Sequence, residues 1–154
     1  MKIVDFLKEK AINANLKATT KEAVIRELVD LLAKAEGLRN KEELIKVLLN
    51  RETLGSTGIG QGVGIPHGKT NVAKELIAAF GICRQGVNFD ALDGEPVYLF
   101  FLLVAPEDSA GPHLKALARI SRLLKDKYFR ESLKSLTDEK IILKLIREED
   151  AKKP

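Results

Sequence analysis

The residues best suited to chemistry are the two histidines of the chain, His67 and His113. His67 lies in the segment Ile-Pro-His-Gly and His113 follows Gly-Pro. An imidazole has a pKa of about 6.5, so near neutral pH it can serve as a nucleophile, a proton carrier or a metal ligand. A pair of histidines taken alone is more often surface or capping residues, so the surrounding elements must decide between these roles.

The segment before His67 is unusually rich in glycine. Six of the eleven glycines fall between positions 55 and 68, in GSTGIGQGVGIPHG. In an extended strand, the glycines that alternate from 58 to 64 would share one face and leave it without side chains. Such a face permits close approach by another backbone, a side chain or a ligand. The glycines alone leave open a bulged strand beneath a tightly packed helix.

The glycine segment does not match a nucleotide-binding loop. Gly55 and Gly60 have the required spacing, but Gln61 stands where the phosphate-binding lysine is needed. The stretch from Gly64 to Thr70 ends in Lys-Thr with one spacer residue too few, and Pro66 removes a backbone N–H donor. No dinucleotide-binding Gly-x-Gly-x-x-Gly pattern fits, so the sequence argues against both kinds of nucleotide site.

Metal and nucleophilic chemistry have little support. A zinc site needs a third ligand, and the only soft one is Cys83, which ends an apolar run and is expected to pack as a small hydrophobe. We therefore predict no metal and no cofactor. Ser56, Ser109 and Ser121 lie outside any Gly-x-Ser-x-Gly elbow. A thiol–imidazole pair of Cys83 with His67 stays open, although no pattern favours it.

Composition predicts one folded domain spanning residues 1–154. Apolar residues make up 45% and charged residues 31% of the chain, as in a soluble globular domain. The net charge of +4 is spread along the chain, so we expect no nucleic-acid surface. The longest apolar run, 97–105, is far shorter than the ~18 residues of a spanning helix. We predict a cytoplasmic protein with no direct membrane insertion, and the single cysteine favours a reducing compartment.

The elements predicted to hold the histidines form an α/β domain. The apolar runs 76–83 and 97–105 favour strands buried on both faces. We expect a short, mixed, mostly parallel β-sheet with helices on both faces. Helix signals stand at Thr19–Glu22 (a capping box, with Gly37 as the stop), at Asn40 (ending near Arg51), at Gly111-Pro112 (with proline first) and at Thr137–Glu139.

This arrangement brings the histidines together if their strands are parallel. Both would then lie at the carboxyl edge of the sheet, where open α/β folds bind ligands. His113 would lie in the first turn of a helix, whose free N–H groups favour an anion. The tail 149–154 is expected to fray.

The run from Arg51 to Gly68, RE-x-LGSTGIG-x-GV-x-IPHG, is similar to the signature of phosphotransferase-system IIA domains of the fructose–mannitol type. The segment Asp93-Gly94-x-Pro96-Val97 before an apolar strand also resembles that family. So does the segment His113-Leu114-x-x-Leu117-Ala118 at a helix start. The resemblance extends over nearly the whole chain.

The resemblance implies a phosphocarrier that works through a phosphohistidine. Such domains accept a phosphoryl group from the phosphohistidine of HPr and pass it to a cysteine of a IIB domain, which serves a membrane sugar permease. By position, the phosphorylated histidine is His67, the second active-site histidine His113 and the active-site arginine Arg51. Lys69 and Arg84 could add long-range attraction, but are more often solvated surface charges. We also expect a small apolar patch around the histidines, because a relay protein binds its partners weakly through an exposed site.

Three alternatives remain. A nitrogen-type regulatory IIA would keep phosphorylation of His67 but act by binding other proteins according to its phosphorylation state. A pure binding module would have lost transfer, which the joint presence of His67, His113 and Arg51 disfavours. A hydrolase built on the glycine segment would turn over a small phosphate ester. The sugar, the oligomeric state and the histidine tautomers cannot be deduced from the sequence.

Overall fold

The sheet at the centre of the molecule is mixed. The computed structural model describes residues 1–153, and its strands follow the order β1-β5-β6-β3-β2, with β4 also pairing with β6. β5 and β6 are antiparallel to each other, whereas β3 and β4 run parallel to β6 and β1 runs parallel to β5. The strands are β1 (Leu7–Asn13), β2 (Gly58–Gly60), β3 (Val63–Gly64), β4 (His67–Lys69), β5 (Ile77–Val87) and β6 (Val97–Ala105).

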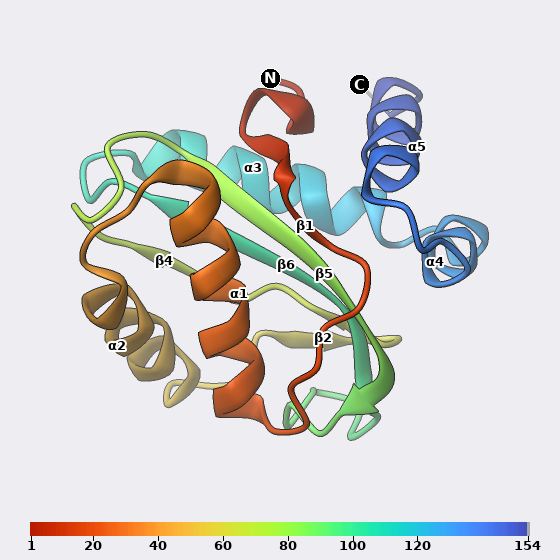
Figure 1. Cartoon of the computed structure of the whole chain (residues 1–154), viewed down its shortest axis with the longest axis horizontal. Helices are drawn as coiled ribbons and strands as arrows, with labels where there is room; N and C mark the ends of the chain where they lie inside the picture. The colour runs from red at the N-terminus through yellow and green to blue at the C-terminus, as the bar shows by residue number, and fades with distance from the viewer. Residues whose placement is uncertain (154) are drawn as a thin grey trace.

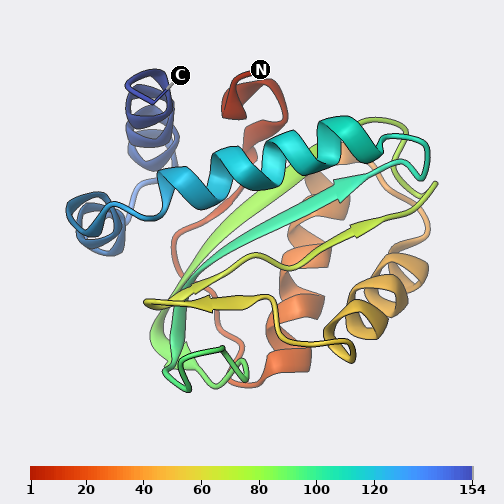
Figure 2. The same cartoon turned by 180° about the vertical axis from the view of Figure 1, so that it is seen from behind.

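Helices cover both faces of this sheet. Figures 1 and 2 show α1 and α2 on one face and α3 on the other, with α4 and α5 beyond the β1 edge. This arrangement confirms the predicted α/β architecture. No helix in residues 1–153 combines the length and apolar character needed to cross a membrane. The helices are α1 (Lys21–Glu36), α2 (Lys41–Glu52), α3 (Ala110–Leu123), α4 (Lys127–Lys134) and α5 (Glu139–Ala151), preceded by the 3-10 turn η1 (Ile3–Asp5).

The helix ends follow the signals in the sequence, with two shifts. The α1 cap is Thr20, whose side chain accepts the Ala23 N–H, so the predicted capping box from Thr19 does not form. Ser109 precedes the first residue of α3, which places Pro112 at the third helical position instead of the first. Proline is tolerated there because the first-turn N–H groups have no intrahelical acceptor.

The two long strands carry the core. Both apolar runs are buried strands as predicted, and their phenylalanines pack ring against ring across the sheet, with Phe80 and Phe101 centroids 5.4 Å apart. β1 and α4 were not predicted. β1 lies at the sheet edge, and its buried and exposed residues do not alternate, since three consecutive central residues (8–10) are exposed.

The glycine segment is a hairpin, not one extended strand, so the predicted bare face of four glycines is wrong. β2 and β3 are antiparallel and joined by a turn in which Gln61 and Gly62 have φ of 58° and 78°. Gly58 packs against Ala91, where an added Cβ would come within 2.9 Å of the Ala91 Cα. Gly58 therefore permits close packing within the chain itself, although against the loop residue Ala91 and not beneath a helix as the alternative interpretation expected.

The C-terminal segment is held more firmly than predicted. Residues 149–151 belong to α5, and Asp150 is only 3% exposed, so the expected fraying is wrong there. The Asp150 carboxylate accepts the Ile3 N–H at 2.8 Å and pairs with Arg119 Nε at 2.6 Å. This contact joins both chain ends to α3, the helix that carries His113.

We predict that Asp150→Ala lowers the free energy of unfolding by about 3 kcal/mol, because it leaves the largely buried Arg119 guanidinium and the Ile3 N–H without their partner. Urea denaturation measures this loss. Glu148→Ala, at an exposed neighbouring position, is the control and should change stability by less than about 0.5 kcal/mol. Equal, small effects of both substitutions would show that this ion pair does not stabilise the fold.

Candidate active site

Both histidines line one open pocket at the edge of the sheet. β4 contributes His67 to this pocket and α3 contributes His113, while the last turn of α2 contributes Arg51. The parallel pairing of β4 with β6 puts the histidines at the same edge, as predicted. Their ring centroids are 5.6 Å apart. The pocket is lined by Val47, Asn50, Arg51, Leu54, His67, Gly68, Lys69, His113 and Leu117.

The His67 ring is oriented by the backbone just before it. Its Nδ1 lies 2.7 Å from the carbonyl oxygen of Ile65. A carbonyl only accepts, so in neutral His67 the Nδ1 carries the proton and donates it. The lone pair of neutral His67 therefore resides on Nε2. This contact determines the tautomer of neutral His67, a point that the sequence left undetermined.

The environment of His67 favours the neutral ring. Burial lowers the pKa of His67 below its usual value of 6.5. The hydrogen bond to Ile65 opposes this shift, while the nearby Arg51 guanidinium lowers the pKa further. Near neutral pH the imidazole is therefore mostly unprotonated, and its Nε2 lone pair is available.

His113 is more deeply buried than His67, with 8% of its surface exposed. Burial, followed by the charges of His67 and Lys69, lowers its pKa to about 4. Its Nε2 is buried and has no hydrogen-bond partner within residues 1–153. Its backbone N–H donates to Ser109 O at 3.0 Å and is therefore already used. The N–H groups of α3 that lack an intrahelical acceptor therefore precede Pro112, and the His113 N–H is not one of them.

Arg51 is held at the rim of the pocket by its own turn. Its Nη1 donates to the Gly55 carbonyl at 3.0 Å. The remaining guanidinium N–H groups can bind an anion, because an arginine presents five donors in a fixed fork. Lys69, also on the pocket wall, is exposed and adds a second positive charge.

Arg84 and Cys83, two other residues considered from the sequence, lie in different environments. Arg84 donates to the carbonyls of Lys134, at 2.6 Å, and Leu136, so it holds the C-terminal end of α4 and is not part of the histidine pocket. Cys83 is buried, and burial raises the pKa of its thiol. Its Sγ lies 3.6 Å from Ala18 O, and it lines a different pocket from His67. These positions argue against a thiol–imidazole pair.

An apolar rim surrounds the histidines. Leu54, after α2, is 83% exposed and Leu114, after His113, is 69% exposed. Val47 and Leu117 continue this surface into the pocket wall. Exposed leucines beside charged groups are typical of protein-binding surfaces. The predicted apolar patch is therefore present, formed in the pocket by Leu54, Val47 and Leu117 with Leu114 exposed on the same helix as His113.

Gly68 is the one glycine of the segment that lies in the pocket. A Cβ at Gly68 would meet Val47 Cγ1 at 3.0 Å, so its absence allows α2 to approach β4 closely. This approach brings Arg51 to the same wall as His67. The sequence offered no way to separate this glycine from the others of the segment.

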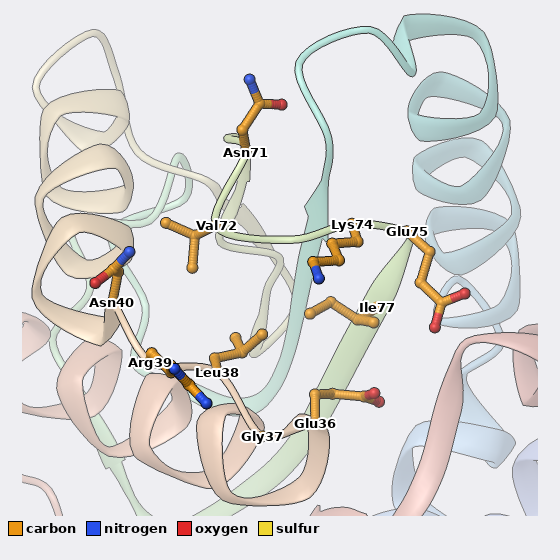
Figure 3. Close-up of a pocket in the computed structure, with 10 residues that line it drawn as sticks. All are labelled: Glu36, Gly37, Leu38, Arg39, Asn40, Asn71, Val72, Lys74, Glu75 and Ile77. Carbon is orange, nitrogen blue, oxygen red and sulfur yellow. The ribbon is translucent and has the colours of Figure 1, made fainter.

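A second pocket lies between the α1–α2 turn and the segment joining β4 to β5 (Figure 3). Its walls carry charged side chains, with Glu36 and Glu75 on one side and Arg39 on the other. It contains neither histidine nor cysteine, and nucleophilic chemistry therefore points to the histidine pocket. No group of three or more His, Cys, Asp or Glu residues within positions 1–153 is arranged to hold a metal ion.

Comparison with known proteins identifies the family. Residues 5–149 match the model of the phosphoenolpyruvate-dependent sugar phosphotransferase system, EIIA 2. Because this match covers most of the chain, the chain belongs to that family. Its members are phosphotransfer components. The family predicted from the Arg51–Gly68 signature is confirmed.

The relatives include both transport and regulatory proteins. The chain is 39% identical over 150 residues to the PTS system fructose-specific EIIABC component of Bacillus subtilis, covering 97% of this chain but only 24% of that longer protein. It is also 39% identical over 146 residues to a nitrogen regulatory protein of Bradyrhizobium diazoefficiens, covering 95% of both chains.

Solved structures have the same fold. The nitrogen regulatory protein IIA-Ntr from Neisseria meningitidis superposes with a TM-score of 0.85 at 34% identity, covering 92% of this chain and 97% of that one. Enzyme IIAMtl of Escherichia coli, solved in complex with phosphorylated IIBMtl, gives 0.76 at 24% identity, with 92% of this chain and 98% of that chain covered. The second likeness concerns the fold alone.

Replacing Arg51 should move the titration of His67. The guanidinium disfavours protonated His67, so Arg51→Gln is expected to raise the pKa of His67 relative to wild type. NMR titration of the imidazole signals measures the change, with Arg147→Gln, an exposed position on α5, as the control. An unchanged or lower pKa in Arg51→Gln would contradict the assigned proximity of the two groups.

His113 should make the fold sensitive to acid. Its pKa is about 4 in the folded chain and 6.5 when solvated, so the unfolded state binds more protons as the pH falls through this window. The stability contributed by neutral His113 is present above about pH 6.5 and lost toward pH 4. Relative to wild type, His113→Gln should therefore gain about 2 kcal/mol in the free energy of unfolding between pH 7 and pH 4.5. Parallel stability–pH curves for the two proteins would contradict this assignment.

Proposed function

We propose that this protein is a phosphocarrier of the phosphoenolpyruvate-dependent sugar phosphotransferase system, with His67 as the residue that carries the phosphoryl group. The observation that best supports the proposal is the hydrogen bond from His67 Nδ1 to Ile65 O, which leaves the Nε2 lone pair free beside Arg51 and His113. Membership of the EIIA 2 family supports the same conclusion.

The proposed transfer needs no cofactor and no separate base. His67 Nε2 attacks the phosphorus of a phosphohistidine on the donor. A new P–N bond forms as the bond to the donor imidazole breaks, and that imidazole leaves with the bonding electron pair. The Nδ1 proton stays on His67, and its hydrogen bond to Ile65 strengthens as the ring gains positive charge.

Arg51 and His113 would stabilise the transferred group. The free guanidinium N–H groups of Arg51 would bind phosphoryl oxygens, whose charge spreads over three oxygens in the transition state. The buried Nε2 of His113 would gain a hydrogen-bond partner from the same group, which would satisfy the polar atom now left unpaired. In this proposal Arg51 and His113 stabilise the charge of the phosphoryl group and fix its position.

The apolar rim formed by Leu54 and Leu114 would receive the partner proteins. For the proposed route the donor is phospho-HPr and the acceptor is the cysteine of a IIB domain that serves a sugar permease, with both transfers in the cytoplasm. A solved IIA–IIB complex of the mannitol system has the same fold in its IIA component, which supports a IIB partner. Fructose is the best-supported sugar class, from the Bacillus subtilis relative.

A second candidate function is nitrogen-type regulation. The match to the Bradyrhizobium diazoefficiens nitrogen regulatory protein covers 95% of both chains, which favours a regulator that binds other proteins according to its phosphorylation state. Both candidates require phosphorylation of His67. They differ in whether a sugar-type IIB domain accepts the phosphoryl group.

The carrier chemistry is tested by intact mass after incubation with enzyme I, HPr and phosphoenolpyruvate. Wild type should gain one phosphate that is acid-labile and base-stable, whereas His67→Ala should gain none. Circular dichroism should show that the variant is folded, with a stability change of about 1 kcal/mol or less. Absence of phosphate on wild type with an active, cognate HPr would refute the proposal.

Removal of the second histidine should slow transfer without abolishing it. His113→Gln is expected to reduce the rate of phosphorylation about 100-fold or more, the usual scale for losing one charge-stabilising donor. Quenched-flow mass spectrometry gives the rate. An unchanged rate in His113→Gln would remove His113 from the site.

Adding a fructose-type IIB domain to the phosphorylated wild type separates the two candidate functions. Transfer of the phosphoryl group to the IIB cysteine supports sugar uptake, and lack of transfer supports regulation.

A further inference from the structure

Glu52 is a buried carboxylate that the proposed transfer does not use. It follows Arg51 at the end of α2, and its side chain is 5% exposed. One carboxylate oxygen accepts the Thr57 backbone N–H at 3.2 Å, and the other accepts the Thr57 hydroxyl in a short hydrogen bond. Lys21 Nζ lies 3.0 Å from the carboxylate and neutralises its charge. A carboxylate buried at such a cost is expected to hold something in place.

The Thr57 contacts lead to His67 through the backbone. The Thr57 carbonyl accepts the Ile65 N–H at 3.0 Å, and the Ile65 carbonyl accepts the His67 Nδ1–H at 2.7 Å. Three consecutive hydrogen-bonded steps therefore connect the Glu52 side chain with the atom that fixes the His67 tautomer. Thr57, Ile65 and Glu52 are all buried, so water does not compete for these bonds.

The same carboxylate holds the turn that orients Arg51. Residues 53–57 form the turn that follows α2. Glu52 holds the far end of this turn, because its carboxylate accepts the Thr57 N–H. At the near end the Gly55 N–H donates to Glu52 O at 3.2 Å. The Gly55 carbonyl then accepts Arg51 Nη1 at 3.0 Å. Both pocket groups thus depend on the position of one turn.

We propose that Glu52 is a positioning residue that fixes the His67 ring and the Arg51 guanidinium relative to each other through Thr57 and the 53–57 turn. This inference rests on the proposed function, since it assigns Glu52 to the same transfer. Glu52 touches neither the phosphoryl group nor the reacting nitrogen, so its effect is one of geometry. Loss of this geometry shifts His67 away from the Nδ1-protonated tautomer and slows attack by Nε2.

The test compares four variants by two measurements. Glu52→Ala removes the carboxylate, Glu52→Gln keeps its shape and an acceptor, and Thr57→Val removes only the hydroxyl. Glu27→Ala is the matched control. The Glu27 carboxylate also accepts backbone N–H groups of a loop, those of Lys17 and Ala18. The first measurement is the His67 tautomer by 15N NMR of the imidazole, and the second is the rate of phosphorylation by phospho-HPr.

The proposal predicts that Glu52→Ala lowers the Nδ1-protonated fraction of neutral His67 and slows transfer about tenfold or more. Thr57→Val should change both quantities in the same direction. Glu52→Gln should retain the tautomer and most of the rate, although loss of the negative charge should lower the pKa of His67 further. Glu27→Ala should leave the tautomer and rate as in wild type.

A wild-type tautomer and rate in Thr57→Val and Glu52→Ala would overturn the proposal. So would equal changes in Glu27→Ala, which would indicate a general loss of structure. If Glu52→Ala does not fold, the isosteric Thr57→Val decides the outcome. The tautomer is measured without phosphorylation, so the positional claim is tested even where no phosphoryl group is accepted and the proposed function fails.

Discussion

The site depends on one hydrogen bond, from His67 Nδ1 to the Ile65 carbonyl. Without it, the two neutral tautomers of the ring would compete and the lone pair would divide between its nitrogens. The bond is supplied by the backbone two residues upstream, in the buried turn between β3 and β4. Its acceptor is fixed in turn by the Ile65 N–H bond to Thr57. A rigid backbone acceptor costs no side-chain entropy, which would suit the proposed transfer between two partner proteins.

The site must also be accessible and desolvated at once. Burial lowers the pKa of both histidines and so keeps them neutral, whereas the proposed transfer needs His67 to be open to another protein. The sheet edge meets both demands, because α2 and α3 contribute the sides of the pocket while the pocket stays open beside the exposed Leu54. A bound partner would exclude the remaining water and strengthen the contacts of Arg51 with a phosphoryl group.

Much of this architecture was predictable from local sequence. Gly37 indicated the helix stop, and the apolar runs 76–83 and 97–105 indicated the buried strands. The Arg51–Gly68 signature and the segment that begins at His113 indicated the three residues that the structure brings to one pocket. Long-range contacts were not predictable: the burial of Asp150 depends on Arg119 and Ile3, and β1 is a strand because β5 provides its partner. The alternating glycines led to a wrong prediction of one bare strand face, because alternation places residues on one face only in an extended chain. Gln61 and Gly62 have positive φ, and the chain reverses direction there. The role of Glu52 depends on contacts five residues away in a turn, which no periodicity reveals.

The central claim, that His67 attacks through Nε2, is tested most directly by locating the phosphate on the imidazole ring. Heteronuclear 15N–31P NMR of the protein phosphorylated by phospho-HPr distinguishes the two nitrogens. The account predicts a single phosphohistidine with the phosphorus bonded to Nε2 of His67 and the proton retained on Nδ1. Phosphorus bonded to Nδ1, or to His113, would contradict it, because Nδ1 is committed to the Ile65 carbonyl and His113 is assigned to stabilise the transferred group, not to attack it.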